Sequence, residues 1–416
     1  MADSDRRLGP NAVAVLVLIA LGAAVLLWQR PWQGAGDNTP AGIPADAPTR
    51  LSSQFRALSE AESESAFVAA AGTTDAAKAL ARQTWQSREA LDATAVELRY
   101  VSGGDVTDRA DGSALAVVDV SWRAGEATGL DASTVHMSSV AFRVAPQADG
   151  RFSIIGATSR DGVLPIWLAG AVTTKQSSGA VVIRVDGGDE ELPVESMAME
   201  ARTAVGRTVP GRQGDLTIVS PNTQEQMAQL VGQASAKIAQ IAAVTTRLDG
   251  RGGSSADTVI VLNPAVFATM DRRAAQVVLS HEATHLLTDA VGTRAESWVV
   301  EGFADFVALR DDSAPLSVSA GQILAEVRAD KLPVRLPSES EFGAGRHGLG
   351  AVYESAWMVF RMLGERHDVA DVVDFYTSVI GGTSLEKALQ TSFGLSVEEL
   401  TSDWRAYLSK SASTVS

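Results

Sequence analysis

A short segment that reads VVLSHEATHLL places two histidines and a glutamate at a spacing that can bind a metal ion. His281, Glu282 and His285 form an H-E-x-x-H pattern. The apolar periodicity predicts a helix over Asp271–Ala290, and residues four apart on a helix lie on the same face. Both imidazoles can therefore bind one Zn²⁺. Glu282 lies beside the metal and could take a proton from water that the metal activates.

The neighbours of this pattern argue that the helix is buried. Val277, Val278, Leu279, Leu286 and Leu287 make it largely apolar. Gly292 supplies the predicted stop of this helix. The alternative is an exposed helix with two spare histidines. Two unpaired buried imidazoles and a buried carboxylate would be costly, and a metal ion removes that cost. The sequence therefore favours a metal site.

A catalytic zinc site needs a third protein ligand and keeps one position open. No histidine follows at the spacing of the H-E-x-x-H-x-x-G-x-x-H class, because residues 292–294 are Gly-Thr-Arg. The candidates are then carboxylates. Asp289 lies on the same helix and can hardly turn back to the metal. Glu296 precedes the run Ser-Trp-Val-Val and could merely cap the next helix.

Glu301 and Asp305 lie four residues apart inside the apolar segment WVVEGFADFVAL. Two acids on one side of an apolar helix need cations nearby. Glu301 as a zinc ligand, with Asp305 accepting the outer N–H of a ligand histidine, satisfies both. The alternative is an acid pair at a helix N-terminus that remains solvated.

The two segments together resemble the gluzincin metallopeptidases. The matching pieces are S-H-E-A-T-H-L-L at 280–287 and W-V-V-E-G-F-A-D-F at 298–306. The chain is most similar to the bacterial peptidase-MA-like group, whose members share an E-G-x-A-[DE] second helix. The resemblance covers roughly residues 180–416, and it implies a thermolysin-like domain with a mixed sheet followed by a mostly helical part.

The resemblance also implies roles for particular residues. His281, His285 and Glu301 would hold one Zn²⁺ per chain, Glu282 would be general base and acid, and Asp305 would hydrogen-bond to His281. The segment VIVLNP at 259–264 would be the edge strand that pairs with an extended substrate.

Members of this family usually carry a further donor that stabilises the oxyanion of the tetrahedral intermediate. Tyr353 and His347, in RHGLGAVYESAWMVFRML, are the catalytic candidates for this role. Tyr353 could instead be an aromatic residue that packs at a helix start. Arg346 could bind a substrate carboxylate, and His367 is interpreted as a cap at a helix end.

Residues 51–170 show helices first and strand-like runs afterwards, which predicts a small α+β domain. This order resembles the nuclear-transport-factor-2-like fold. His136 falls in one of the strands without a partner at ligand spacing, so we interpret it as structural. The predicted helices are Leu51–Ala71 and Asp75–Leu91, and the predicted strands are Ala95–Val101, Ala114–Arg123, Thr134–Val144 and Phe152–Ala157.

From residue 171 onwards strands and helices alternate before the chain becomes mostly helical. This region, 171–416, is the predicted metallopeptidase domain. Its predicted strands are 181–185, Leu216–Ser220 and Thr258–Leu262, and its first predicted helices are Val194–Val205 and Thr223–Ile241.

The N-terminal segment Asn11–Trp28, NAVAVLVLIALGAAVLLW, contains no charged residue. Eighteen helical residues span about 27 Å, close to the hydrocarbon core of a bilayer. The sequence therefore predicts a cytoplasmic stub at 1–10, a transmembrane helix at 11–28, a Pro/Gly linker at 29–50 and an extracytoplasmic remainder. The alternative is a signal peptide that is cleaved to release a secreted protein.

Composition limits the partners of the chain. It has 416 residues, 45% of them hydrophobic and 20% charged, which is typical of a globular protein of two or three domains. The net charge of −15 argues against nucleic acid as a partner. The absence of cysteine excludes disulfides and thiolate metal sites, and leaves five histidines for imidazole chemistry.

The sequence thus predicts a membrane-anchored zinc metallopeptidase that hydrolyses peptide or protein substrates. One alternative is a catalytically idle zinc-binding or sensor module that keeps the fold. Another is a zinc hydrolase of non-peptide acyl substrates, because amides and other acyl compounds use the same machinery.

Overall fold

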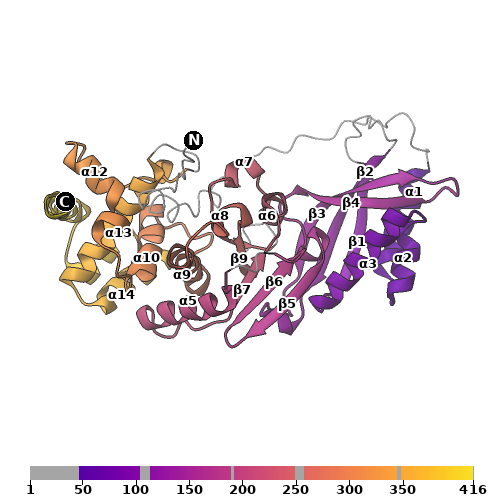
Figure 1. Ribbon diagram of the computed structural model, residues 1–416, viewed down its shortest axis with the longest axis horizontal. Helices are drawn as coiled ribbons and strands as arrows, with labels where there is room; N and C mark the ends of the chain where they lie inside the picture. Colours follow the sequence, from indigo (N-terminus) through magenta and orange to yellow (C-terminus); the bar gives the residue numbers. More distant parts are fainter. Residues whose placement is uncertain (1–45, 104–112, 189–191, 249–256, 344–347, 416) are drawn as a thin grey trace, which may run out of the picture.

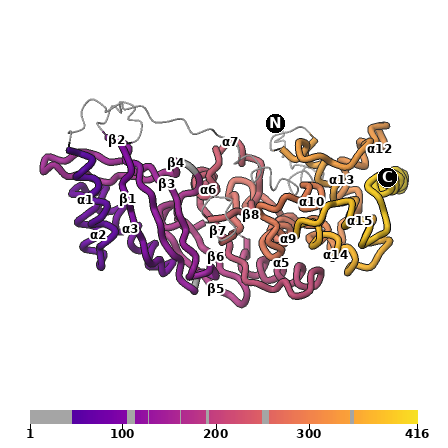
Figure 2. Tube along the Cα trace, turned by 180° about the vertical axis from the view of Figure 1, so that it is seen from behind, coloured from indigo at the N-terminus to yellow at the C-terminus, as the bar shows by residue number. Residues whose placement is uncertain are grey.

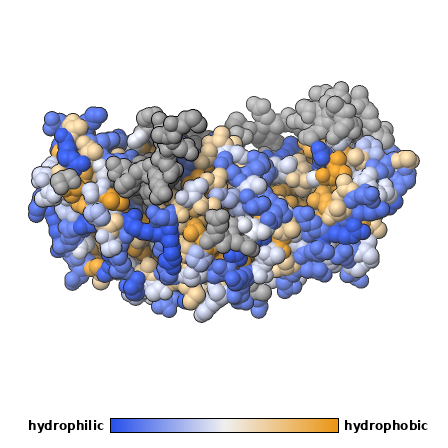
Figure 3. Space-filling model, viewed as in Figure 1, coloured by the Kyte–Doolittle hydropathy of each residue, from blue (hydrophilic) through white to orange (hydrophobic). Residues whose placement is uncertain are grey.

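The computed structural model describes five stretches of the chain: 46–103, 113–188, 192–248, 257–343 and 348–415. Along the long axis of the molecule, three helices and a four-stranded sheet lie at one end, a five-stranded sheet lies in the middle, and a bundle of helices lies at the other end (Figures 1 and 2). The face drawn in Figure 3 is mostly hydrophilic, with small scattered apolar areas.

The first part packs three helices against one face of an antiparallel sheet with the order β1-β2-β3-β4. Strand β2 pairs with β3 in continuous register from Ala114↔Val144 to Trp122↔His136. The elements are α1 (Ala47–Ser59), α2 (Glu64–Ala71), α3 (Asp75–Ala90), β1 (Thr94–Gly103), β2 (Ala114–Arg123), β3 (His136–Pro146) and β4 (Phe152–Asp161), with a short 3₁₀ turn η2 (Glu126–Thr128).

The predicted helix Leu51–Ala71 is in fact two helices. α1 ends at Ser59, and α2 starts at Glu64 after Ser63, whose hydroxyl accepts a hydrogen bond from the backbone N–H of Ala66. Because serine is a strong N-cap, it begins a new helix instead of continuing the old one.

The second sheet is mixed and has the order β5-β6-β7-β9-β8. β6 and β7 are parallel, as are β7 and β9, whereas the outer strands β5 and β8 are antiparallel to their neighbours. Its elements are α4 (Ile166–Ala169), β5 (Val172–Ser177), β6 (Ala180–Val185), α5 (Val194–Thr208), β7 (Leu216–Ser220), α6 (Gln224–Val231), α7 (Ser235–Ile238), β8 (Ala243–Arg247) and β9 (Thr258–Leu262).

The structure corrects two expectations for this sheet. The segment Thr258–Leu262 is β9, which lies between β7 and β8 and is not an edge strand. The edge strand next to β9 is β8, a strand that sequence reasoning missed. The predicted helix Thr223–Ile241 is divided into α6 and α7, because Gly232 adopts a left-handed conformation that ends α6.

Each face of the five-stranded sheet belongs to a different hydrophobic core. Val181, Ile183 and Val261 point into a core that they share with α1, the first sheet and α6. Val182 and Ile260, on the alternate positions, point into the core of the helical part. Because side chains alternate along a strand, one sheet is the common wall of both cores.

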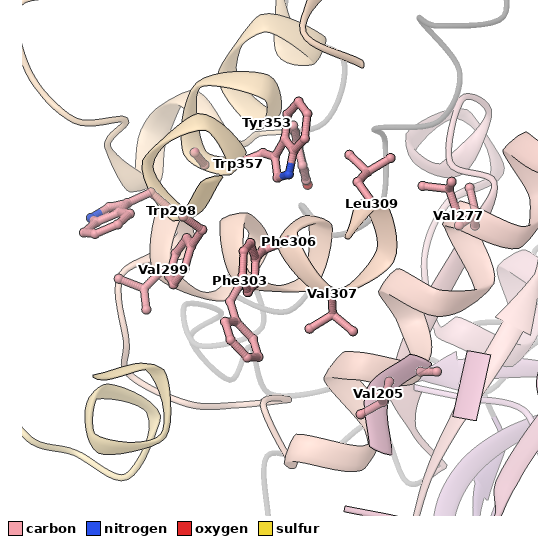
Figure 4. Close-up of a cluster of buried hydrophobic side chains, with 14 of the residues drawn as sticks. Val205, Val277, Trp298, Val299, Phe303, Phe306, Val307, Leu309, Tyr353 and Trp357 are labelled. Atoms are coloured by element: carbon pink, nitrogen blue, oxygen red, sulfur yellow. The ribbon is translucent and has the colours of Figure 1, made fainter. Parts of the chain in front are cut away.

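The helical part surrounds two adjacent helices, α9 and α10. Aromatic side chains from α10 and α13 meet in its core, among them Phe303, Phe306 and Trp357 (Figure 4). The elements are α8 (Pro264–Phe267), α9 (Arg272–Thr288), α10 (Ser297–Leu309), α11 (Leu316–Ser319), α12 (Gly321–Arg328), η3 (Glu339–Glu341), α13 (Leu349–Arg366), α14 (Val369–Ile380), α15 (Leu385–Phe393) and α16 (Val397–Thr414).

The predicted fold class is wrong where it begins with a transmembrane helix. No helix within the described stretches is long and apolar enough to cross a membrane. The longest ones have 18 residues, and α13, for example, carries Glu354, Arg361 and Glu365. The segment 11–28 lies outside the described residues. The fold class that the structure gives is mixed α/β with two sheets.

Gly302 allows α10 and α13 to approach each other closely. A Cβ atom at this position would lie 2.6 Å from the backbone oxygen of Ala356 and 2.8 Å from its carbonyl carbon. Backbone atoms of a buried helix cannot move aside easily, so the glycine of the E-G-x-A-D pattern has a packing role.

We expect Gly302→Ala to destabilise the protein by about 1–3 kcal/mol through overpacking, although alanine favours helix over glycine by about 1 kcal/mol. Gly321→Ala in α12 is the matched control, because nothing lies within 4 Å of its added Cβ. Urea unfolding of both variants measures the difference. If the two variants are equally stable, the close approach of α10 and α13 at Gly302 does not contribute to stability.

Candidate metal centre

α9 carries the H-E-x-x-H residues between the five-stranded sheet and α10. Its N-terminus is capped by Asp271, whose carboxylate accepts a hydrogen bond of 2.8 Å from the backbone N–H of Ala274. The helix ends at Asp289, which adopts a left-handed conformation (φ +57°). The predicted stop at Gly292 therefore comes three residues too late. His281, Glu282 and His285 are all buried.

α10 lies against α9 and carries the two acids. Glu296 is its N-cap residue and is exposed, whereas Glu301 and Asp305 are buried one and two turns further on. The rest of α10 is strongly apolar and buried, so the side that carries the two acids is buried together with it. The four candidate carboxylates therefore divide into Glu301 and Asp305, which contact the histidines of α9, and Asp289 and Glu296, which lie at helix ends.

The side chains of His281, His285 and Glu301 converge on one point. The two Nε2 atoms are 2.9 Å apart, and Glu301 Oε2 lies 3.1 Å from His281 Nε2 and 3.5 Å from His285 Nε2. Ligands about 2.0–2.1 Å from a tetrahedral metal lie about 3.3 Å from one another. This buried group could hold a metal ion.

Asp305 determines which nitrogen of His281 is free for a metal. His281 Nδ1 lies 2.7 Å from Asp305 Oδ1. The carboxylate can only accept, so in the neutral ring, the form that binds a metal, Nδ1 carries the proton and Nε2 presents its lone pair to the convergence point. Burial opposes protonation of His281, but the carboxylates of Asp305 and Glu301 outweigh it and raise the pKa of the imidazole well above its ordinary value.

The three converging atoms fit a cation well. Two imidazole nitrogens and a carboxylate oxygen can all donate electron pairs at the contact distances above, and all three side chains are almost fully buried. Without a positive charge between them, such a group would be unfavourable. The donor set of two nitrogens and one oxygen suits a borderline-soft divalent metal.

Glu282 lies beside this group and is held from the sheet. Thr245 Oγ1 of β8 is 2.6 Å from Glu282 Oε2. Glu282 Oε1 is buried and has no hydrogen-bond partner among the described residues. Burial raises the pKa of Glu282, while the nearby His281 and His285 and the contact with Thr245 act in the opposite direction.

Tyr353 approaches the site from α13. Its ring centroid is 6.5 Å from that of His281 and 5.2 Å from that of Phe342, which packs edge-on against it. Burial raises the pKa of Tyr353 well above its ordinary value, and the carboxylates of Glu301, Asp305 and Glu282 raise it further. The phenol therefore stays protonated and can act as a hydrogen-bond donor.

The other sequence candidates lie elsewhere. His347 and Arg346 are outside the described residues. His136 is buried in β3, with its ring against Trp122 and its Nε2 3.2 Å from Asp257. His367 is the C-cap residue of α13 and packs on Phe393.

Sequence reasoning missed two residues of β8 that contact the site. Thr245 contacts Glu282, and Arg247 Nη2 donates a hydrogen bond of 2.8 Å to the backbone oxygen of Val291, in the loop after α9. The only local signal was the short β-branched run Val-Thr-Thr in residues 244–246. Five residues are too few for periodicity to identify a strand with certainty.

A cavity of about 440 Å³ opens beside the converging ligands. His285 and Glu301 form part of its wall, and the loop from Ala290 to Ser297 forms most of the rest. Its charged residues are Arg294, Glu296 and Glu339. A larger hollow of about 620 Å³ lies between α5, α9 and α10, but its lining includes none of the three ligand residues. Of these two, the smaller cavity is therefore the one that adjoins the converging side chains.

A comparison with protein-family models finds no match for this chain, and no curated protein matches it in sequence. The interpretation of the site consequently depends on its geometry.

Glu354 is a buried carboxyl group next to Tyr353 that joins α13 to α12. Its Oε2 accepts a hydrogen bond of 2.8 Å from the backbone N–H of Ile323, and Gln322 Nε2 lies 3.4 Å from its Oε1. Burial raises the pKa of Glu354 to about 8, although these hydrogen bonds favour the ionised form. The acid thus holds a proton in the folded chain at pH values where the unfolded chain has lost it.

We expect Glu301→Ala to lower the affinity for Zn²⁺, used as the probe ion, by orders of magnitude, because it removes one of three converging donors. Glu296→Ala is the matched control and should leave the affinity nearly unchanged, since Glu296 is exposed outside the group. Asp305→Ala should lower it about 10–100-fold by freeing the His281 ring. Zinc titration of chelator-treated protein gives the three values. A larger loss for Glu296→Ala than for Glu301→Ala would contradict this assignment.

We expect folding stability to fall by about 1.4 kcal/mol per pH unit through Glu354 as the pH rises from about 5 towards 8. In this window the unfolded carboxyl has lost its proton and the folded one retains it, so deprotonation favours unfolding. Above the folded pKa the contribution becomes constant. Glu354→Gln removes this dependence, and urea unfolding of both proteins between pH 5 and pH 9 measures it. If the unfolding free energies of the parent and of Glu354→Gln change in parallel with pH, Glu354 ionises normally.

Proposed function

We propose that the protein is a zinc-dependent peptidase. The observation that carries the proposal is the convergence of His281 Nε2, His285 Nε2 and Glu301 Oε2, with Glu282 beside them. Three protein ligands leave one position open, which is the arrangement of a catalytic zinc site and not of a closed structural one. The resemblance of both segments to gluzincin metallopeptidases supports the same assignment. A zinc ion held there would act as a Lewis acid that polarises a carbonyl group and makes water more acidic.

Glu282 is the general base and acid of the proposed reaction. Its Oε2 is engaged by Thr245, and its Oε1 has no partner within the described part of the chain. Oε1 can therefore take the proton from the attacking water and then deliver it to the leaving amine. The raised pKa of this buried carboxyl suits a group that must both accept and return a proton.

Tyr353 supplies a hydrogen-bond donor on the other side of the site. The phenol remains protonated at ordinary pH for the electrostatic reasons given above. It can donate to the oxygen that becomes negative as the tetrahedral intermediate forms. Phe342 packs against its ring and restricts its orientation.

The edge strand β8 and the cavity give an extended peptide a place to bind. β8 has a neighbour in the sheet on one side only, so its other edge can pair with a peptide backbone. The same strand contacts Glu282 through Thr245. The cavity beside His285 and Glu301 offers space for a substrate side chain.

We expect Glu282→Gln to retain zinc and thermal stability but to lower peptide hydrolysis by at least about 10²–10⁴-fold. Glutamine keeps the size and hydrogen-bonding capacity of the side chain while removing its basic oxygen. The assay incubates the zinc-loaded parent and variant with a diverse peptide mixture, with and without chelator, and maps the products by mass spectrometry.

Three results would contradict the proposal or the role that it gives Glu282. A Glu282→Gln protein that binds zinc and cleaves as fast as the parent would exclude the mechanism. A zinc-loaded parent that cleaves no peptide would leave a metal-binding protein without peptidase activity. A Glu282→Gln variant that loses both its zinc and its thermal stability would assign Glu282 a structural role.

A further inference from the structure

Two side chains of the edge strand β8 reach the helix that carries the ligands. Thr245 contacts Glu282 on α9, and Arg247 holds Val291 in the loop that follows α9. Residues two apart on a strand point to the same side of the sheet. Ala243, two residues before Thr245, packs into the core of the helical part, so this side of β8 is the side on which α9 lies.

The two oxygens of Glu282 have different surroundings. Thr245 Oγ1 is 2.6 Å from Oε2, and no hydrogen-bond partner for Oε1 occurs in the described stretches. Both side chains are buried, with exposures of 0% for Glu282 and 1% for Thr245, so solvent cannot replace the contact. The last torsion of a glutamate is broad and nearly two-fold, so the carboxylate needs an external contact to define its plane.

The Thr245 hydroxyl has a second possible acceptor, but this does not change the difference between Oε1 and Oε2 of Glu282. Thr245 Oγ1 also lies 3.0 Å from the backbone oxygen of Glu282. When the carboxylate is ionised, the hydroxyl donates to Oε2 at the shorter distance. When Oε1 has taken a proton, Oε2 can still accept a hydrogen bond from the hydroxyl. The contact therefore persists in both states of the carboxyl group.

We infer that Thr245 is a positioning residue for the general base: its hydroxyl holds Oε2 of Glu282 and thereby leaves Oε1 as the proton acceptor. The inference rests on the proposed function and adds to it a determinant outside the metal-binding helices. It also links substrate binding to the base, because the strand that would pair with an extended peptide is the strand that orients Glu282.

The test compares three variants in the full chain loaded with zinc. Thr245→Val keeps the shape of the side chain and removes the hydroxyl, and Thr245→Ser restores the hydroxyl. Thr217→Val is the matched control: Thr217 is also buried in this sheet, and its hydroxyl donates a hydrogen bond of 3.0 Å to the backbone oxygen of Thr128, on the side of the first part.

We expect Thr245→Val to lower kcat about 10–100-fold, the size of effect that a misplaced catalytic group produces, with KM and zinc content nearly unchanged. Thr245→Ser should recover most of the lost kcat. Thr217→Val should lose thermal stability to a similar degree and keep the kcat of the parent. A Thr245→Val protein with the parent kcat, or a Thr245→Ser protein as slow as Thr245→Val, would overturn the inference.

A stability measurement on the metal-free chain tests the contact without any activity. Thr245→Val should lower Tm by about 2–4 °C, because it leaves a buried carboxyl oxygen without its partner. In a Glu282→Ala background the same change should have much less effect, since the partner oxygen is already gone. Additive effects on Tm would overturn the inference, because they would show that the two side chains do not interact. If the parent cleaves no peptide, the proposed function fails and Thr245 positions no base, whereas non-additive effects on Tm would still establish the contact itself.

Discussion

The site depends on one electrostatic constraint: five ionisable side chains of α9 and α10 are almost fully buried, where little water can solvate them. His281, Glu282, His285, Glu301 and Asp305 are all less than 5% exposed. Burying an unpaired charge costs far more than a typical domain can offset, so each of these groups must compensate another. The hydrogen bond from His281 to Asp305, the approach of Glu301 to both imidazoles and the contact of Glu282 with Thr245 meet this requirement. The geometry that could hold a metal ion is thus also the condition for packing these two helices.

The surrounding helices hold this arrangement by close packing. Gly302, between the two acids of α10, lets the backbone of α13 come near and brings Tyr353 towards His281. Tyr376 of α14 stacks on Phe303 with ring centroids 3.8 Å apart, and its hydroxyl lies 2.8 Å from Thr288 Oγ1 near the end of α9. Because such contacts leave little free volume, the ligands are presented by rigid elements, which is what a preorganised site requires.

The sequence could predict the parts of the site that lie on long, regular elements. His281, His285, Glu301 and Asp305 occur at helical spacing inside apolar runs, so their burial and mutual approach follow from local pattern. Thr245 could not be found in this way, because its role depends on β8, which is short and becomes an edge strand only through the order of the folded sheet. For the same reason β9 was assigned the edge position that β8 holds. Ser63 and Asp289 show that helix ends are also hard to predict from the sequence. Each lies at a helix end that is determined by the conformation of one residue, whereas the apolar periodicity continues past that residue.

The five-stranded sheet has a consequence for how the chain can be divided. Val181, Ile183, Val219 and Val261 are covered by the first part of the molecule, although they lie beyond the predicted boundary at residues 170 and 171. A fragment that starts at residue 171 would expose this continuous apolar surface to solvent, and such surfaces promote aggregation. Recombinant work on the metal centre therefore needs the first part as an intramolecular cover, and an insoluble short fragment would say nothing about the chemistry of the site.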